Sequence, residues 1–336
     1  MSKRDKNTTG QQYILFDSAD EINMAETTDI DIHINSSAKK DSTDNPVIDE
    51  VDAITATPSI KFISFGSGSS GNCAYIGTET SGVLIDAGVD SDQVFKALKA
   101  NNIQPESIKG ICITHDHGDH IRYAYTIVRK YKHMHIYCTN RVMNGILRRH
   151  SITRRIKDYH IAIYKEITIE IAGLKITAFE VPHDGSDNAG FFIEYADKNF
   201  TIATDLGHVS ERAYHYMCKA NYLMIESNYD SRMLNEGRYP EYLKNRIRAA
   251  NGHLDNSDTA RFIADNYTET LKYVFLCHLS NDNNTPEIAR NEIINALAEK
   301  NISVGNGESS LEDRSKDIQL VVLPRYESSA LFILRD

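Results

Sequence analysis

Three histidines and two aspartates crowd into the six residues from His115 to His120, directly after the apolar segment Gly110–Ile113. Imidazole nitrogens and carboxylate oxygens are the ligands that Zn, Mn and Fe prefer. On an extended loop, His115 and His117 can face one ion while Asp119 and His120 reach a second. The run therefore predicts a two-metal hydrolytic site. The alternative is a solvated polar turn, which so dense a group of histidines disfavours.

Three further metal-capable side chains stand where apolar, strand-like segments end. His183, Asp205 and His278 each follow such a segment, as His115 does. Functional side chains at the carboxyl ends of several strands can converge on one edge of a sheet. We therefore expect these residues to meet at one site.

A proton donor is predicted next to the metals. His253 lies just before a predicted helix that starts near Ser257, where its side chain can face the site without being a ligand. Glu226, at the end of a predicted strand, can accept a hydrogen bond from the other ring nitrogen of His253 and fix its tautomer. With Asp119, these two form the predicted catalytic group. The alternative for His253 is a helix cap.

The elements that must position these residues alternate between short apolar runs and helical patterns. The predicted strands are Lys61–Phe65, Cys73–Ile76, Gly82–Asp86, Gly110–Ile113, His135–Cys138, Glu166–Ile171, Lys175–Val181, Gly190–Tyr195, Asn199–Ala203, Tyr222–Ile225 and Tyr273–Leu276. The predicted helices are Ser91–Asn101, Ile121–Tyr131, Arg141–Arg149, Glu211–Cys218, Tyr239–Ala250, Ser257–Tyr267 and Pro286–Glu299. This order favours an α/β (α+β) fold with two sheets packed face to face and helices outside.

A glycine-rich run, Gly66-Ser-Gly-Ser-Ser-Gly71, matches the dinucleotide-binding fingerprint. That interpretation needs a helix directly after the run, to hold a pyrophosphate at its N-terminus. A strand-like segment follows instead, which favours a hairpin turn. We expect this turn at the rim of the site, with Ser70 and Asn72 able to contact an anionic substrate.

Composition indicates a soluble protein. Of the 336 residues, 41% are hydrophobic, and no apolar run approaches the roughly 20 residues of a membrane span. The charged start Met1–Lys6 has no apolar core behind it, so we expect no secretory leader. The five cysteines form no Cys-x-x-Cys pair, which predicts reduced, mostly buried thiols and a cytoplasmic protein.

Acidic charge gathers at the N-terminus. Residues 1–57 carry five basic and twelve acidic side chains, so they account for −7 of the net charge of −10. We predict a disordered acidic tail over 1–57 and a catalytic domain over 58–336. The rest of the chain is then nearly neutral, which no longer opposes a nucleic-acid partner. Two basic stretches, 148–157 and 244–248, are candidate phosphate contacts, with solvated basic faces as the alternative.

The order of these residues resembles the ligand set of the metallo-β-lactamase superfold, over essentially Ile60 to the C-terminus. More specific strings resemble the YycJ/WalJ-like branch of that superfold; they are Gly66-Ser-Gly-Ser-Ser-Gly-Asn72, Thr204-Asp-Leu-Gly207, Glu226-Ser-Asn228, Gly237-Arg-Tyr-Pro240, Gly252-His-Leu-Asp-Asn256 and His278-Leu-Ser-Asn-Asp-Asn-Asn284. The resemblance implies a four-layer αββα sandwich with the metals between the sheets at one edge. The long acidic tail and Tyr229, where many relatives have His, depart from the pattern.

The resemblance also implies a role for each residue of the set. The first metal would be bound by His115, His117 and His183, the second by Asp119, His120 and His278, with Asp205 linking the two and Asp86 orienting the loop without binding metal. The best-known true β-lactamases carry Cys at the position of Asp205 and Arg at the position of His120. Hydrolysis of β-lactam drugs is therefore disfavoured.

The function implied is a nuclease with two divalent ions, Zn or Mn, and a 5′-to-3′ exonuclease activity on double-stranded DNA. The pairing of His253 with Glu226 resembles that of related tRNA-processing nucleases. The alternatives are hydrolysis of RNA or of a small-molecule ester, thioester, lactone or cyclic nucleotide by the same metals. A regulatory scaffold is a third alternative, which the intact ligand set disfavours.

Overall fold

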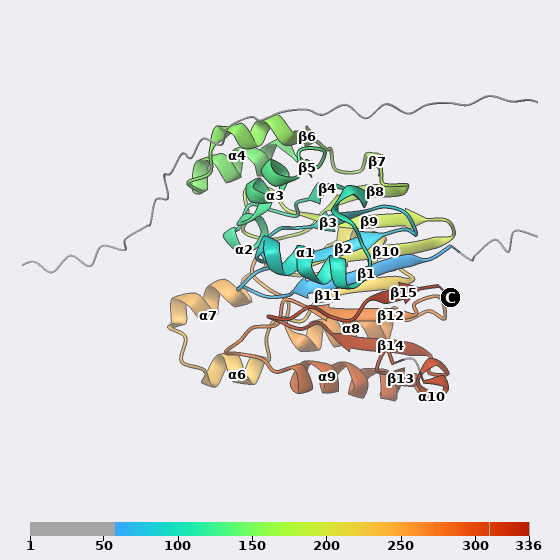
Figure 1. The fold of residues 1–336 in the computed structure, drawn as a ribbon. Coiled ribbons are helices and arrows are strands. Elements are labelled where there is room, and N and C mark those ends of the chain that lie inside the picture. Colours follow the sequence, from blue (N-terminus) through green and yellow to red (C-terminus); the bar gives the residue numbers. More distant parts are fainter. Residues whose placement is uncertain (1–57, 309, 336) are drawn as a thin grey trace, which may run out of the picture. The chain divides into compact units, whose positions relative to one another are not determined.

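The computed structural model describes residues 58–308 and 310–335, so the predicted acidic tail lies outside the described residues. Two sheets form the centre of this part of the chain (Figure 1). The first has the order β15 (Phe332–Leu334), β1 (Ile60–Gly66), β2 (Cys73–Gly77), β3 (Gly82–Ile85), β4 (Ile108–Cys112), β5 (His135–Cys138), β6 (His160–Ala162). The second has the order β13 (Val304–Gly305), β14 (Ile318–Val322), β12 (Tyr273–Cys277), β11 (Tyr222–Glu226), β10 (Lys198–Ala203), β9 (Ala189–Tyr195), β8 (Leu174–Glu180), β7 (Thr168–Ile171).

The space between the sheets is filled by aromatic and branched side chains. The ring of Phe62 on β1 lies 5.0 Å from that of Phe200 on β10 and 4.6 Å from that of Phe275 on β12. All three are fully buried. Strands place alternate residues on opposite faces, so a second set of apolar residues is left for the outer face of each sheet.

Helices cover both outer faces (Figure 1). The first sheet is covered by α1 (Ser91–Ala100), α3 (Ala124–Lys130) and α4 (Asn140–Arg149), and the second by α5 (Glu211–Met217), α8 (Asn256–Asp265) and α9 (Pro286–Glu299). The short helices are α2 (Gly118–Ile121), α6 (Ser231–Glu236), α7 (Glu241–Arg248) and α10 (Leu311–Arg314), with 3₁₀ turns at Pro105–Ser107 and Arg154–Tyr159. The predicted αββα architecture is confirmed.

Parallel pairing sets the position of the site. Strands β3, β4, β5 and β6 run parallel, as do β10, β11, β12 and β14. The segments that follow β3 and β4 therefore leave the first sheet at one edge, and those that follow β10, β11 and β12 leave the second sheet at one edge.

The single helix predicted over Ile121–Tyr131 is wrong. It is divided into α2 and α3, because the loop after β3 takes two backbone hydrogen bonds at the break. The amide of Ala87 donates to the carbonyl of His120, and the amide of Tyr123 donates to the carbonyl of Ala87. These bonds fix α2 against the loop that carries Asp86.

Other sequence predictions are settled by the strands and thiols. Strand β2 follows the glycine-rich turn, so the dinucleotide interpretation is wrong and the hairpin is confirmed. All five cysteines are free and four are buried, as predicted. None of the helices in the described part of the chain has the length and apolar composition needed to cross a bilayer.

Candidate metal centre

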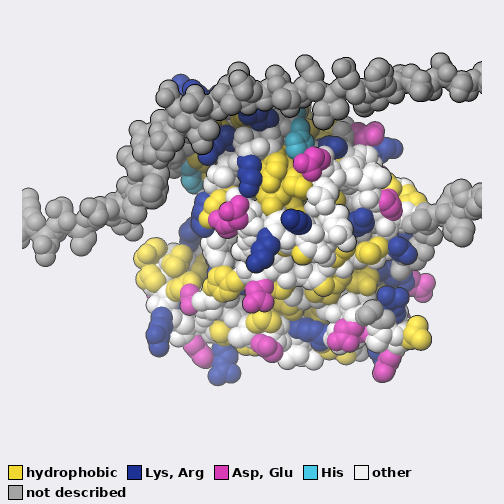
Figure 2. Space-filling model, viewed as in Figure 1, with side chains coloured by type: hydrophobic (Ala, Val, Ile, Leu, Met, Phe, Trp, Pro, Cys, Tyr) yellow, Lys and Arg dark blue, Asp and Glu magenta, His cyan; other side chains and the backbone are white. Residues whose placement is uncertain are grey.

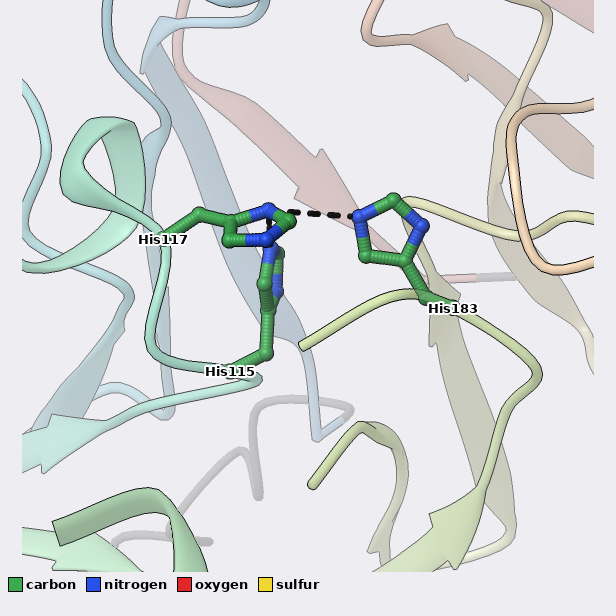
Figure 3. A group of neighbouring side chains, drawn as sticks. All are labelled: His115, His117 and His183. Atoms are coloured by element: carbon green, nitrogen blue, oxygen red, sulfur yellow. Dashed lines mark hydrogen bonds between the residues drawn. The ribbon is translucent and has the colours of Figure 1, made fainter. Parts of the chain in front are cut away.

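The first group of donors comes from two loops. His115 and His117 lie on the loop after β4, and His183 lies on the loop after β8; their rings face one another in Figure 3. Nδ1 of His117 is 3.0 Å from Nε2 of His115 and 3.3 Å from Nε2 of His183. Three nitrogens thus converge, as three ligands of one ion would.

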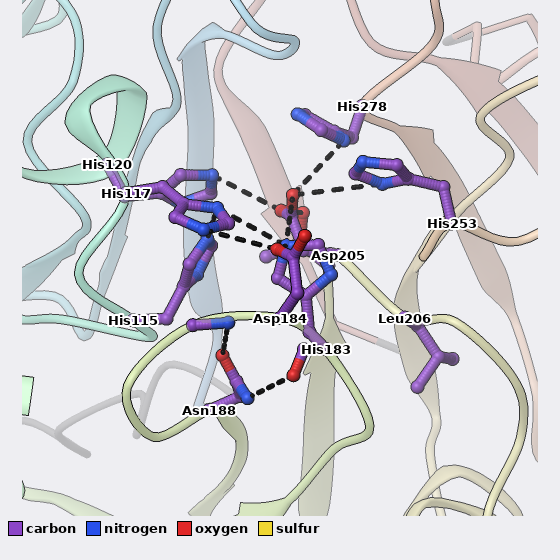
Figure 4. Close-up of polar contacts among 12 residues, drawn as sticks. His115, His117, His120, His183, Asp184, Asn188, Asp205, Leu206, His253 and His278 are labelled. Carbon is purple, nitrogen blue, oxygen red and sulfur yellow. Dashed lines mark hydrogen bonds and ion pairs between the residues drawn. The ribbon is translucent and has the colours of Figure 1, made fainter. Parts of the chain in front are cut away.

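The second group lies beside the first. Oδ2 of Asp119 is 3.7 Å from Nε2 of His120 and 3.6 Å from Nε2 of His278. Asp205, after β10, lies between the groups (Figure 4). Its Oδ2 is 3.2 Å from His120 Nε2, and its Oδ1 is 3.7 Å from His183 Nε2. One carboxylate therefore touches both groups.

Each of the five histidines has one ring nitrogen turned into the groups, and the other nitrogen contacts a further side chain or carbonyl. These contacts are His115 Nδ1 to Thr114 Oγ1, His117 Nε2 to Asp184 Oδ1, His120 Nδ1 to Asp86 Oδ2, His183 Nδ1 to the Gly252 carbonyl, and His278 Nδ1 to Glu226 Oε1. Asp184 Oδ1 also lies 3.5 Å from His183 Nε2, so it borders the first group. Metal-binding histidines are oriented in this way, because the outer contact fixes the tautomer. Nε2 of His278 is buried and has no hydrogen-bond partner among the described residues. This donor set fits divalent ions.

The backbone is strained at three of these positions. Asp86, Asp205 and His278 have φ angles of 60°, 49° and 53°; Asp86 and His278 directly follow a strand, and Asp205 lies two residues after β10. Residues other than glycine rarely adopt this left-handed conformation, which costs on the order of 1–3 kcal/mol each at such sites. The strain turns each side chain from its strand end toward the site.

Asp86 orients the histidine loop. Its Oδ1 accepts from the Thr114 amide at 2.8 Å, and its Oδ2 accepts from His120 Nδ1 at 2.7 Å. Asp86 is 2% exposed and is not among the groups of side chains that converge closely enough to hold an ion. Asp86 therefore holds His120 and the backbone of the histidine loop without joining the donor groups.

One carboxylate oxygen of Glu226 accepts hydrogen bonds from two histidines. Its Oε1 accepts from His253 Nδ1 at 2.8 Å and from His278 Nδ1 at 2.9 Å. Its Oε2 accepts from the Leu206 and Leu254 amides. Burial raises the pKa of Glu226, but His253 and His278 outweigh it and lower the pKa to about 2. The sequence predicted only the contact with His253.

The side chain of His253 lines the cavity over the donor groups. The cap of α8 is Asp255, whose side chain accepts from the Ser257 amide. The alternative role of His253 as a helix cap is therefore wrong.

Two carboxylates that the sequence analysis missed support the histidine loops. Asp116 is fully buried and accepts from the amide and hydroxyl of Ser186 at 2.7 and 2.6 Å. Asp184 accepts from Arg246 Nε at 2.7 Å. Both directly follow a site histidine in the sequence, which is the signal that could have found them.

The glycine-rich turn differs from its prediction. Asn72 is buried, and its Nδ2 lies 2.9 Å from His120 Nε2, so it contacts the donor group and is not an exposed substrate contact. Of the histidines left without a role, His150 lines the cavity and bonds the Asp116 carbonyl at 2.7 Å, whereas His208 bonds the Ala250 carbonyl outside both groups.

Only some side chains of the two basic stretches, 148–157 and 244–248, face the cavity. Lys244 is buried and donates to the Asn235 carbonyl, so it is structural. Arg149 and Arg246, one from each stretch, line the cavity.

Comparison with known proteins agrees with this geometry. Residues 82–277 match the family model described as the Beta-lactamase superfamily domain. This chain belongs to the β-lactamase superfamily. Within the superfamily, the chain is 32% identical to "Exodeoxyribonuclease YycJ" of Bacillus anthracis, over 73% of this chain and 92% of that protein. It is 31% identical to "Exodeoxyribonuclease WalJ" of Streptococcus pneumoniae serotype 2 strain D39, over 73% of this chain and 91% of that protein.

A solved structure shows the same superfamily fold. The metallo-β-lactamase fold protein YhfI of Bacillus subtilis has a TM-score of 0.59 and 13% identity, covering 82% of this chain and 99% of that one. The predicted membership of a metallo-β-lactamase-fold hydrolase family with exodeoxyribonuclease relatives is confirmed.

Proposed function

We propose that residues 58–336 form a two-metal phosphodiesterase that acts as a 5′-to-3′ exonuclease on double-stranded DNA. One observation carries the proposal: Asp205 touches two donor groups beside the pair His253 and Glu226. The relatives named as exodeoxyribonucleases support DNA as the substrate. The free, buried thiols support a cytoplasmic location.

The donor groups suggest how two ions would be shared. His115, His117 and His183 would hold one ion, and Asp119, His120 and His278 the other. Asp205, which lies against His120 and His183, would contact both. Imidazole and carboxylate suit Zn and Mn. When bound, such ions lower the pKa of water and neutralise charge on phosphoryl oxygens.

The protein's own groups complete the reaction. The alkoxide that leaves the phosphorus needs a proton, and His253 lines the cavity where it can supply one. Glu226 holds the His253 ring through Nδ1, which directs Nε2 as the donating atom. Asp86 and Asp184 keep the ligand histidines in one tautomer.

Cleavage of end-labelled double-stranded DNA tests the proposal. Metal-stripped protein receives Mn or Zn, and Asp205→Asn is the control. We expect stepwise release of short products by the wild type alone. Absence of cleavage while two ions bind per chain would contradict DNA as the substrate and favour RNA or a small-molecule ester.

A further inference from the structure

A cavity of about 400 Å³ opens over the donor groups, between the end of α4 on one side and α7 on the other. This volume is at the small end of ligand pockets, which run from roughly 300 to 1,000 Å³. It suits one nucleotide better than a stacked base pair. The volume of the cavity therefore suits a single nucleotide of a DNA strand.

Two arginines flank the opening in matching ways. Nη1 of Arg149 lies 3.6 Å from Asp116, and Nε of Arg246 lies 2.7 Å from Asp184. Their side chains are 42% and 56% exposed. Arg246 is thus held by a hydrogen bond from its Nε to Asp184, whereas Arg149 lies at ion-pair distance from Asp116, and both keep N–H groups for a ligand. Guanidinium groups match phosphate oxygens in geometry and charge.

The wall formed by Tyr239 and helix α7 is apolar and rigid. Tyr239, Leu243 and Ile247 line the cavity. The hydroxyl of Tyr239 donates to Asp282 at 2.6 Å, which fixes the ring. Lys244 ties α7 to α6 through the Asn235 carbonyl at 2.7 Å. An apolar wall beside two cationic groups is complementary to a base with its phosphates.

We propose that this cavity binds one unpaired nucleotide at a strand end, with its base against Tyr239 and Leu243 and its phosphates between Arg149 and Arg246. The inference rests on the proposed nuclease function and specifies its substrate. Acidic and basic side chains are interspersed on the face shown in Figure 2, so this face offers no continuous basic surface. A duplex must then open its terminal pair to enter.

Binding without catalysis tests this. Fluorescence anisotropy would measure how tightly the metal-stripped, full-length wild type binds a short thymidine oligomer. The same measurement would use an oligomer that carries an abasic residue at either end. Leu243→Ala removes one side chain of the apolar wall and leaves Tyr239 and Ile247 in place. Tyr242→Ala is the matched control, because Tyr242 is the neighbouring residue on α7, is 76% exposed and does not line the cavity.

We expect the terminal abasic residue to weaken wild-type binding about fivefold or more. Leu243→Ala should also weaken binding of the intact oligomer and reduce the abasic penalty, since both changes remove the contact between the base and Leu243. Tyr242→Ala should behave as wild type. Equal wild-type binding of both oligomers, no binding of the intact one, or a full abasic penalty in Leu243→Ala would overturn the inference.

Hydrolysis of bis(p-nitrophenyl) phosphate by the metal-loaded protein separates this inference from the proposed function. One outcome is that Asp205→Asn abolishes hydrolysis of this diester while the wild type binds the intact and abasic oligomers equally well. That outcome would reject the nucleotide cavity and retain the phosphodiesterase. Hydrolysis of neither DNA nor this diester by the wild type would reject the phosphodiesterase itself.

Discussion

Arg246 and Asp184 form an ion pair of 2.7 Å that joins helix α7 to the loop after β8. The second oxygen of Asp184 lies 3.2 Å from His117 Nε2. A side chain at the substrate cavity is therefore connected through one carboxylate to a candidate ligand.

Asp184→Asn should weaken metal binding by about 10- to 100-fold, the usual cost of removing an outer partner of a ligand histidine. The amide carries no charge to attract the His117 ring, whose Nε2 lies 3.2 Å from Asp184 Oδ1. Competition with a chelating dye measures the loss.

Asp187→Asn is the matched control for this change. Asp187 lies on the same loop but pairs with Lys165 at 2.6 Å, away from the donor groups. Its metal affinity should equal that of the wild type. Equal affinities for both variants would show that Asp184 does not support His117.

His253→Ala should lower kcat by roughly 10²- to 10⁴-fold, as expected when a general acid is removed. Both ions should stay bound, because His253 is held by Glu226 and not by the ligand histidines. Turnover of DNA and metal content by atomic emission give the two readouts. Loss of metal from this variant would exclude the proton-donor role.

Glu226→Gln should damage stability as well as turnover. The amide cannot accept from two histidines and two backbone amides at once, so buried donors lose their partner. Breaking a buried ionic contact costs about 3–5 kcal/mol. Urea unfolding measures this loss of stability. The control is His253→Ala, whose unfolding midpoint should stay close to that of the wild type. A wild-type midpoint for Glu226→Gln would argue against the shared contact.

Glu79, far from the candidate metal centre, makes a pH-dependent contribution to the free energy of unfolding. Burial alone would raise its pKa, but hydrogen bonds from Tyr195 and Ser59 lower it below the ordinary value. The contribution is therefore present above about pH 4.5, the ordinary pKa, and is lost as the pH falls through the folded-state pKa.

The unfolding free energy of wild type should exceed that of Glu79→Gln by about 1 kcal/mol or less at pH 7, since the carboxylate is exposed. The difference should shrink as the pH falls below about 4.5 and vanish once Glu79 is protonated in the folded state as well. Glu106→Gln, which changes an exposed carboxylate with no side-chain hydrogen bond among the described residues, should show no such trend. A difference that grows on acidification would contradict the assignment.

The donor set was predictable because each member sits where a local pattern changes. An apolar strand that ends in His or Asp is visible in the sequence, as at His183 and Asp205. Parallel strands then bring such positions to one edge without further information. The break between α2 and α3 was not visible, since its cause is the loop at Ala87, far along the chain.

Contacts between distant segments account for what was missed. The partner of Asp184 is 62 residues away, on a helix whose orientation depends on packing with α6. Strand β15 has three residues, and only its pairing with β1 makes it a strand. Asn72 was expected to be exposed because its turn is polar, yet the turn folds over His120.

The pairing of β1 with β15 also indicates where the protein can be circularly permuted or attached to a support. Ile60 lies opposite Leu334 in this antiparallel pair, so β1 begins where β15 ends. β1 points in the same direction as β3, whose end carries Asp86, so this junction lies at the far edge from the metal centre. A circular permutant that links these two strands through a short loop should keep its catalytic edge intact, and immobilisation through the C-terminal strand should leave that edge open to solution.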